Sequence, residues 1–320
     1  MAVAISVSGL RKSYGSLLAV EDVSFEVGEG EIFGLLGSNG CGKTTTVECL
    51  QGLRRPDAGR VRIFGLDPQS QRRELRRRIG SQLQESALPD RIKVWEAMRL
   101  FASLAPGGVD WSGLIEQWGL AAKRNASFAS LSGGQRQRLF IALALVCDPQ
   151  VVFLDEMTTG LDPAARRETW GLINAVRDAG TTVVLVTHFM DEAQRLCDRV
   201  AVVRRPGRVI ALDTPGALVA AHTGGTRLTF ALPSPHDGAD VGWLARVPGV
   251  RDVACDRGRV QITGEGAVVA HVGHALIERG IEPTDLQVLQ PSLEEVYLQL
   301  TGDDGRGEGD DAHAGGDHVA

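Results

Sequence analysis

Residues 31–53 read EIFGLLGSNGCGKTTTVECLQGL, and this stretch decides the fold. The apolar run at 32–36 predicts a short buried strand, and residues 44–53 predict a helix. Between them, residues 37–44 fit the spacing G-x-x-x-x-G-K-[ST]. Glycines in this pattern turn backbone amides inward around a phosphate, and the dipole of the following helix adds positive potential. The first prediction is therefore a phosphate-binding loop between a strand and a helix.

The charged and hydroxyl side chains of this loop have separate expected roles. Lys43 supplies a positive charge to the β- and γ-phosphates of a nucleotide, and the Thr44 hydroxyl is a ligand for Mg²⁺. The alternative is a glycine-rich turn with a solvated lysine, which the flanking strand and helix disfavour. The residues expected to contact the nucleotide are Gly37, Ser38, Asn39, Gly40, Cys41, Gly42, Lys43, Thr44 and Thr45.

Two further apolar runs end in residues that suit phosphate chemistry. Residues 151–156, VVFLDE, predict a buried strand that ends in Asp155 and Glu156, at the edge where open α/β sheets gather ligands. We expect Asp155 to hold Mg²⁺ and Glu156 to polarise a water for attack on the γ-phosphate. Residues 182–188, TVVLVTH, place His188 at the end of another strand. There it either contacts the γ-phosphate or is an ordinary hydrogen-bonded histidine at a strand end.

The sequence LSGGQ, residues 131–135, precedes a helix with a wide apolar face. Ser132 suits the N-cap of that helix, and an uncovered helix start presents backbone amides to an anion. We expect this second anion-binding feature to be formed by Ser132, Gly133, Gly134 and Gln135. Spacing alone fits an ordinary capped helix equally well.

The rest of the chain predicts two domains and a tail. Strands alternate with helices from residue 32 to about 203, which indicates an α/β layered core with a mostly parallel sheet. Residues 1–30 predict an antiparallel appendage, and the strand and helix patterns after residue 225 predict a small α+β domain. We place the boundaries at 1–215, 216–302 and 303–320, the last being a disordered acidic tail.

The composition of the chain argues against several classes of function. The chain has 320 residues and a formal net charge of −6, and residues 301–320 carry six acids and one base. The remainder is therefore almost neutral and has no basic excess that would indicate a nucleic-acid partner. No apolar run reaches the length of a membrane span, and the N-terminus lacks the pattern of a signal peptide. The five cysteines show neither zinc-site nor disulfide spacing.

Together these motifs resemble the ATP-binding subunit of ABC transporters over residues 3–215. LSGGQ is similar to the family signature, VVFLDE to its Walker B strand, and TGLDP, residues 159–163, to its D-loop with Asp162. The resemblance implies a P-loop NTPase cassette with a helical subdomain that binds ATP and Mg²⁺. It also implies that two cassettes dimerise, so that the signature of one faces the phosphate loop of the other.

The same resemblance assigns three further residues. His188 matches the switch histidine, and Gln84 matches the Q-loop glutamine that touches Mg²⁺ and signals to the membrane partner. Tyr14 matches the aromatic residue that stacks on adenine. For Tyr14 the alternative is an exposed tyrosine in a turn between strands.

The end of the second domain indicates which type of ABC transporter subunit the chain resembles. PSLEEVYLQLTG, residues 291–302, resembles the end of ATPase subunits of the daunorubicin-resistance type, which serve ABC-2 exporters. The resemblance implies a peripheral subunit on the cytoplasmic side of the cell membrane. It would work as a homodimer with a separate multi-span permease to export a drug, an antibiotic or another hydrophobic compound. An exporter subunit for a lipid or polysaccharide is the nearest alternative.

A non-transport ABC ATPase, regulatory or linked to nucleic acid, is the other alternative. The basic run QRRELRRR at 71–78 is the one feature that favours it. No aromatic residue interrupts that run, and nucleic-acid modules commonly combine the two. A solvated helix face is the preferred interpretation, and we expect no nucleic-acid partner.

Overall fold

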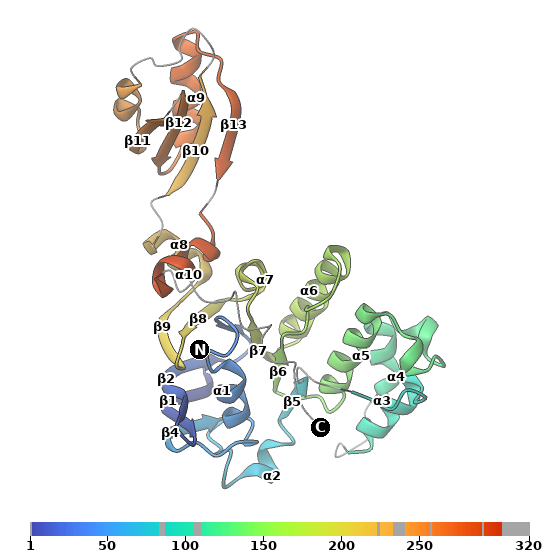
Figure 1. Cartoon of the computed structure of the whole chain (residues 1–320). Coiled ribbons are helices and arrows are strands. Elements are labelled where there is room, and N and C mark those ends of the chain that lie inside the picture. Colours follow the sequence, from blue (N-terminus) through green and yellow to red (C-terminus); the bar gives the residue numbers. More distant parts are fainter. Residues whose placement is uncertain are drawn as a thin grey trace, which may run out of the picture. The chain divides into compact units, whose positions relative to one another are not determined.

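The computed structural model describes residues 2–82, 87–104, 110–222, 225–232, 241–256, 258–289 and 291–302. The chain divides into two compact units, Met1–Leu218 and Val219–Ala320, and Figure 1 labels the elements of both. The tail predicted for residues 303–320 lies outside the described residues.

The first unit is built on a nine-stranded sheet in the order β4-β1-β2-β9-β8-β3-β7-β6-β5. Its strands are β1 (Val3–Tyr14), β2 (Leu17–Gly28), β3 (Ile32–Leu36), β4 (Ala58–Ile63), β5 (Ile79–Gln82), β6 (Val151–Asp155), β7 (Thr182–Thr187), β8 (Arg199–Arg204) and β9 (Arg208–Asp213). The strands β3, β5, β6, β7 and β8 pair in parallel, as the alternation of strands and helices predicted. The antiparallel hairpin β1–β2 continues the same sheet through a single pair, Asp22 with Arg208.

The central strands β3, β6 and β7 are buried along their whole length, because their β-branched and aliphatic residues face helices on both sides. Their parallel register pairs Leu36 with Thr187 and Asp155 with Val186. The carboxyl ends of all three strands therefore lie at one edge of the sheet. The phosphate loop, Glu156 and His188 each follow directly from one of these ends.

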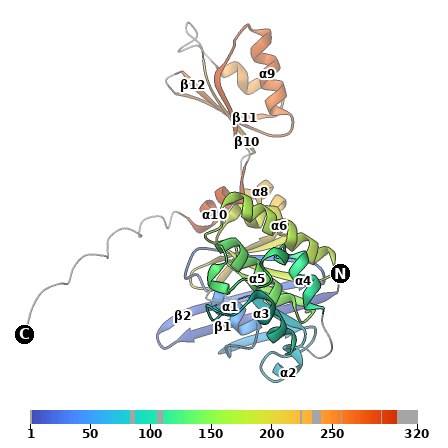
Figure 2. The same ribbon diagram turned by 90° about the vertical axis from the view of Figure 1, so that its right-hand side faces the viewer.

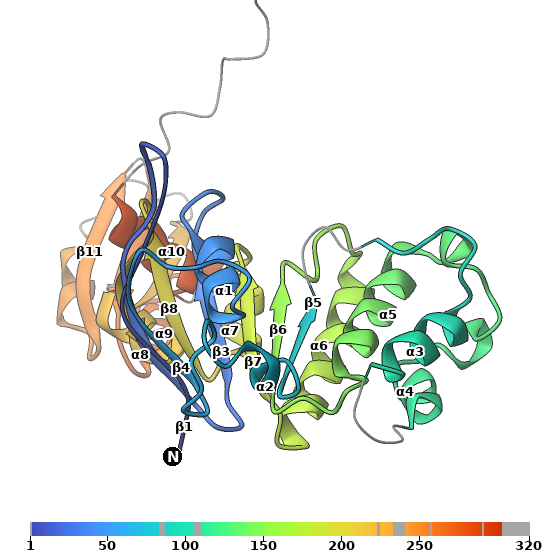
Figure 3. The ribbon, with the colours of Figure 1, turned by 90° about the horizontal axis from the view of Figure 1, so that it is seen from below.

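Helices cover the sheet and form a separate group beyond β5. Next to the central strands are α1 (Lys43–Leu50), α6 (Pro163–Asp178) and α7 (Met190–Leu196). The group beyond β5 consists of α3 (Val94–Ala102), α4 (Trp111–Gln117) and α5 (Gly133–Leu145), as Figures 1 and 3 show. The remaining helices of this part are α2 (Arg72–Leu75), α8 (Pro215–His222) and the short 3₁₀ turns Ala121–Lys123 and Phe128–Ser130. The α/β fold with a helical subdomain is confirmed.

The second unit contains a four-stranded antiparallel sheet in the order β11-β12-β10-β13. Its strands are β10 (Thr226–Ala231), β11 (Val250–Asp256), β12 (Arg259–Gly264) and β13 (Thr284–Leu289). Helix α9 (Val268–Glu278) lies along one face of this sheet, as Figure 2 shows, and buries Val268, Val272 and Leu276 against Phe230 and Ile262. A short 3₁₀ turn, Gly242–Arg246, and the last helix, α10 (Leu293–Thr301), complete the unit.

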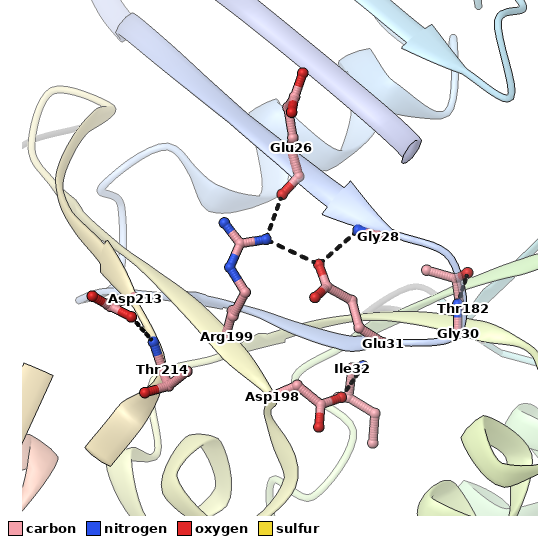
Figure 4. A network of polar contacts seen from close by, with 10 residues as sticks. All are labelled: Glu26, Gly28, Gly30, Glu31, Ile32, Thr182, Asp198, Arg199, Asp213 and Thr214. Carbon is pink, nitrogen blue, oxygen red and sulfur yellow. Dashed lines mark hydrogen bonds and ion pairs between the residues drawn. The ribbon is translucent and has the colours of Figure 1, made fainter. Parts of the chain in front are cut away.

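A polar network around the buried Glu31 secures the turn between β2 and β3, at the end of the sheet opposite the phosphate loop (Figure 4). Glu31 is only 4% exposed, and its Oε1 accepts hydrogen bonds from the Gly28 amide at 2.8 Å and from Arg199 at 3.3 Å. Arg199 also donates to the Glu26 carbonyl at 3.1 Å. Asp198 accepts from the Ile32 amide at 2.8 Å. The network fixes where β3 begins relative to β8.

The described residues hold no helix that combines the length and the apolar character needed to cross a bilayer.

We predict that Glu31→Ala lowers the free energy of unfolding by about 1–3 kcal/mol, because the substitution leaves partly buried donors without their acceptor. Urea denaturation of the full chain measures this change. The control is Glu29→Ala in the same turn, where the side chain is exposed and a change within about 0.5 kcal/mol is expected. Equal destabilisation by both substitutions would contradict the role of the network.

Candidate functional site

The loop after β3 turns sharply, and two of its glycines are required by close backbone contacts. Gly42 has a φ of +102°, and a Cβ atom at this position would lie 2.4 Å from the Ala19 carbonyl oxygen. A Cβ atom at Gly37 would lie 2.4 Å from the Val203 carbonyl oxygen. Only glycine fits both positions without displacing a neighbouring strand. The local spacing that predicted the loop therefore has a steric cause.

Lys43 begins α1 directly after this turn and points back over the loop. Its ammonium group donates to the Gly37 carbonyl at 2.8 Å and to the Ser38 carbonyl at 2.9 Å. The side chain is 5% exposed, so a positive charge lies buried against the carbonyl oxygens of the loop. Such an arrangement attracts the phosphates of a nucleotide.

Asp155 and Thr44 lie beside this loop and supply oxygen atoms. The Thr44 hydroxyl donates to Asp155 Oδ2 at 3.4 Å. Burial, together with the nearby Glu156 carboxylate, raises the pKa of Asp155 to about 6, and Lys43 and Thr44 oppose that increase. Within the described ranges, the other carboxyl oxygen, Oδ1, is buried and has no hydrogen-bond partner. A hard cation would satisfy this oxygen, so the donor set fits Mg²⁺.

Glu156 and His188 face one another from the ends of adjacent strands. His188 Nδ1 lies 3.1 Å from Glu156 Oε1. The backbone of Glu156 is held at a φ of +47°, a left-handed conformation that is unfavourable for a side chain of this size. The sharp turn after β6 places the carboxylate at the edge of the sheet. The two residues predicted to act on the γ-phosphate are thus in direct contact.

One pocket of about 510 Å³ contains most of the predicted nucleotide contacts. It is lined by Tyr14, Leu17, Leu18, Ala19, Asn39, Gly40, Gly42, Lys43, Thr44, Thr45, Glu156 and Arg205. Tyr14 is 39% exposed at the mouth of the hairpin, with the Lys12 ammonium 5.5 Å from its ring centre. The ring is therefore available to stack on a base. Cys41 is buried behind the loop.

Arg205 is a pocket residue that the sequence analysis did not anticipate. It follows β8, and β8 lies beside β3 in the sheet. Its guanidinium lies 3.6 Å from the position that a Cβ atom of Gly40 would occupy. The sequence RVAVVRRPG contains a basic residue after a buried strand, which is the same signal that pointed to His188. Arg205 adds a second positive charge to the pocket.

The LSGGQ segment lines a different pocket, of about 480 Å³, together with the D-loop. Ser132 caps α5: its hydroxyl accepts from the Gln135 amide at 3.3 Å, and the Gln135 side chain accepts from the Ser132 amide at 3.1 Å. Asp162 caps α6 in the same way, accepting from Ala164 at 2.9 Å. The linings of this pocket and of the phosphate-loop pocket have no residue in common. Within one chain, the LSGGQ segment therefore does not line the pocket of the phosphate loop.

Gly133 and Gly134 line the second pocket and leave open space beside it. The φ of Gly133 is not positive, and a Cβ atom at this position would meet no atom of this chain within 4 Å. A larger residue would therefore be tolerated if only this chain had to be accommodated. Gly134 is in a similar situation, with only ordinary van der Waals contacts to Ala165 and Leu161. The glycines therefore leave open space on this side of the second pocket.

Gln84, the remaining predicted site residue, lies outside the described residues.

Comparisons with known proteins agree with this geometry. The family profile described as "ABC transporter" matches residues 20–159. The solved structure of cbiO1 from Clostridium perfringens, part of the ABC transporter complex cbiONQ, has a TM-score of 0.63 and 27% identity, covering 69% of this chain and 92% of that chain. The dimeric bacterial ABC transporter cassette MJ0796 has a TM-score of 0.60 and 25% identity, covering 66% of this chain and 98% of that chain.

Curated relatives extend the similarity into the second unit. The daunorubicin resistance ATP-binding protein DrrA3 of Streptomyces coeruleorubidus is 38% identical over 312 residues, which cover 95% of this chain and 97% of that protein. The Nod factor export ATP-binding protein I of Paraburkholderia xenovorans is 37% identical over 310 residues, which cover 93% of this chain and 97% of that protein. With the phosphate loop, the Glu156–His188 pair and the signature in place, the chain belongs to the ATP-binding subunits of ABC transporters, and it is an ATPase.

Proposed function

We propose that the chain hydrolyses ATP with Glu156 as the residue that polarises the attacking water. Its contact with His188 supports this assignment, because a carboxylate held by a second polar group has a defined orientation toward the γ-phosphate. His188 steadies the γ-phosphate and keeps the Glu156 carboxylate in place. Lys43 and Arg205 neutralise charge on the phosphates, and Tyr14 stacks on the adenine.

Mg²⁺ completes the site under this proposal. Thr44 and Asp155 would hold it, and the buried Oδ1 of Asp155 is the atom that most needs such a ligand. When bound, the metal neutralises charge on the β- and γ-phosphates. Gln84 is proposed as a further contact to the metal on the basis of the family resemblance alone.

A homodimer of cassettes is the proposed active form. The separate linings of the two pockets support it, since a second copy would supply the missing half of each site. Gly133 and Gly134 would then admit the nucleotide bound to the other copy. ATP binding closes the two cassettes, and hydrolysis reopens them. Asp162 fixes the start of α6 at this proposed interface.

The proposed cellular role is to energise export of a drug, an antibiotic or another hydrophobic compound through a separate permease. The observation that carries it is the 38% identity to a daunorubicin resistance protein over 95% of the chain, second unit included. The chain would act at the cytoplasmic face of the membrane as a peripheral subunit. The similarity to Nod factor export proteins favours export of a lipid-linked saccharide as the second candidate.

We predict that Lys43→Ala reduces affinity for ATP by about 100-fold, because the substitution removes a buried charge-assisted contact to the phosphates. Displacement of a fluorescent ATP analogue from the full chain measures this. The matched control is Lys123→Ala, which removes an exposed lysine that lines neither pocket. Unchanged binding by the Lys43 variant would contradict the proposed phosphate site.

We predict that Glu156→Gln retains ATP binding but lowers turnover by about 1,000-fold, because an amide cannot polarise the water as a carboxylate does. The variant should also accumulate as an ATP-bound dimer, which size-exclusion chromatography with multi-angle light scattering measures. Glu116→Gln, an exposed residue of α4 that lines neither pocket, is the control. Normal turnover by Glu156→Gln would show that another group acts on the water.

Export is tested with inverted membrane vesicles that contain the full chain and a multi-span permease that co-purifies with it. ATP-dependent uptake of daunorubicin, abolished by Lys43→Ala, is the expected result. Uptake of a lipo-oligosaccharide without uptake of daunorubicin would favour the second candidate instead. Failure of the chain to bind any multi-span protein in detergent extracts would contradict a transport role.

A further inference from the structure

Glu192 is a buried carboxyl group that the proposed ATP chemistry does not use. It lies in α7, four residues after His188, and its exposed fraction is 0%. Its Oε1 accepts a hydrogen bond from the Trp170 indole nitrogen of α6 at 3.2 Å. A carboxyl group in an apolar interior is costly unless several donors satisfy it. The groups that face the Glu192 carboxyl therefore decide whether its burial is stable.

The first neighbour is Thr187, the residue directly before His188. The Thr187 hydroxyl oxygen accepts a hydrogen bond from the Phe189 amide at 3.0 Å. The same hydroxyl lies close enough to the Glu192 carboxyl to oppose the increase that burial causes in the Glu192 pKa. The residues on the two sides of His188 are thus joined by a hydrogen bond next to Glu192. This arrangement restricts the rotation of the backbone that carries the imidazole.

The second neighbour is Thr158, two residues after Glu156. Its side chain is fully buried, and its hydroxyl is close enough to favour the charged form of Glu192. Within the described part of the chain, Thr158 Oγ1 and Glu192 Oε2 are nevertheless both buried without a partner of acceptable hydrogen-bond geometry. A small shift of either segment would complete a bond between them. Glu192 therefore also faces the turn that sets the backbone of Glu156.

The third neighbour, Trp170, connects Glu192 to α6, the helix that follows the D-loop. Around this bond, Arg166 of α6 lies 3.5 Å from Asp191 and 4.6 Å from the ring centre of Phe189. Arg195 of α7 lies 5.7 Å from the Trp170 ring centre. Helices α6 and α7 are thus held together by polar and cation–π contacts on both sides of Glu192. The carboxyl group is the buried centre of this interface.

We propose that Glu192 is a positioning residue for ATP hydrolysis: its bond to Trp170 fixes α7, which begins two residues after His188, on helix α6, and its buried carboxyl packs between the strand end at Thr187 and the turn at Thr158. This inference rests on the proposed roles of Glu156 and His188. It assigns Glu192 no contact with ATP, so the substitution of Glu192 affects the rate of turnover and not the binding of nucleotide.

The test compares three variants of the full chain. Glu192→Ala is expected to lower kcat at least about tenfold while the KM for ATP and the affinity for a fluorescent ATP analogue change less than about twofold. Glu192→Gln is expected to restore most of the rate, because its amide keeps the size of the side chain and can still accept the hydrogen bond from Trp170. The matched control is Glu31→Ala, which removes an equally buried carboxylate from the network at the opposite end of the sheet. It is expected to lower stability while leaving kcat within about twofold.

Equal losses of kcat in Glu192→Ala and Glu31→Ala, in proportion to lost stability, would overturn the proposal. So would a rise in KM with kcat unchanged. If Glu192→Ala does not fold, Trp170→Phe removes only the indole donor, and a kcat reduced at least about threefold with unchanged nucleotide affinity supports the proposal. An unchanged kcat in that variant counts against it. Normal turnover by Glu156→Gln would instead indicate that the proposed function itself is wrong.

Discussion

The parallel pairing of β3 with β7, and of β7 with β6, is the constraint on which the site depends. It brings Leu36, Asp155 and Thr187 to one edge of the sheet, although the sequence separates the first from the last by about 150 residues. The phosphate loop, Glu156 and His188 each follow directly from these strand ends. A shift in register of one residue would turn the side chains of a whole strand to the opposite face. The polar network at Glu31 and Asp198 opposes such a shift from the other end.

Steric limits in the phosphate loop, together with the strand register, determine the shape of the nucleotide site. Gly42 and Gly37 lie too close to neighbouring strands to carry a side chain, and the left-handed backbone of Glu156 places its carboxylate at the strand edge. The charges are few and individually placed: Lys43 against the loop carbonyls, Asp155 beside the loop and Glu156 against His188. A nucleotide site can therefore form in a chain whose charge is otherwise nearly balanced.

Much of this arrangement could be predicted because it is encoded locally. The phosphate loop has a fixed spacing, and the strands around 32–36, 151–155 and 182–187 are continuous apolar runs with turn signals on both sides. Strands β4 and β5 were not anticipated, since β4 is exposed over half its length and β5 has only four residues. Arg205 could not be assigned to the pocket, because sequence does not reveal that β8 lies beside β3. Glu192 is preceded by the exposed Asp191, and only the packing of α6 on α7 decides which of the two is buried.

The distribution of cysteines bears on how the second unit can be studied. Cys41, Cys49 and Cys197 are buried, Cys147 is partly buried, and Cys255 is exposed in β11. Burial raises the pKa of Cys41, Cys49, Cys147 and Cys197, which keeps these thiols protonated. A maleimide dye at neutral pH would therefore attach preferentially to Cys255. The natural sequence thus provides a handle for fluorescence measurements that report on the second unit while the nucleotide pocket stays unlabelled.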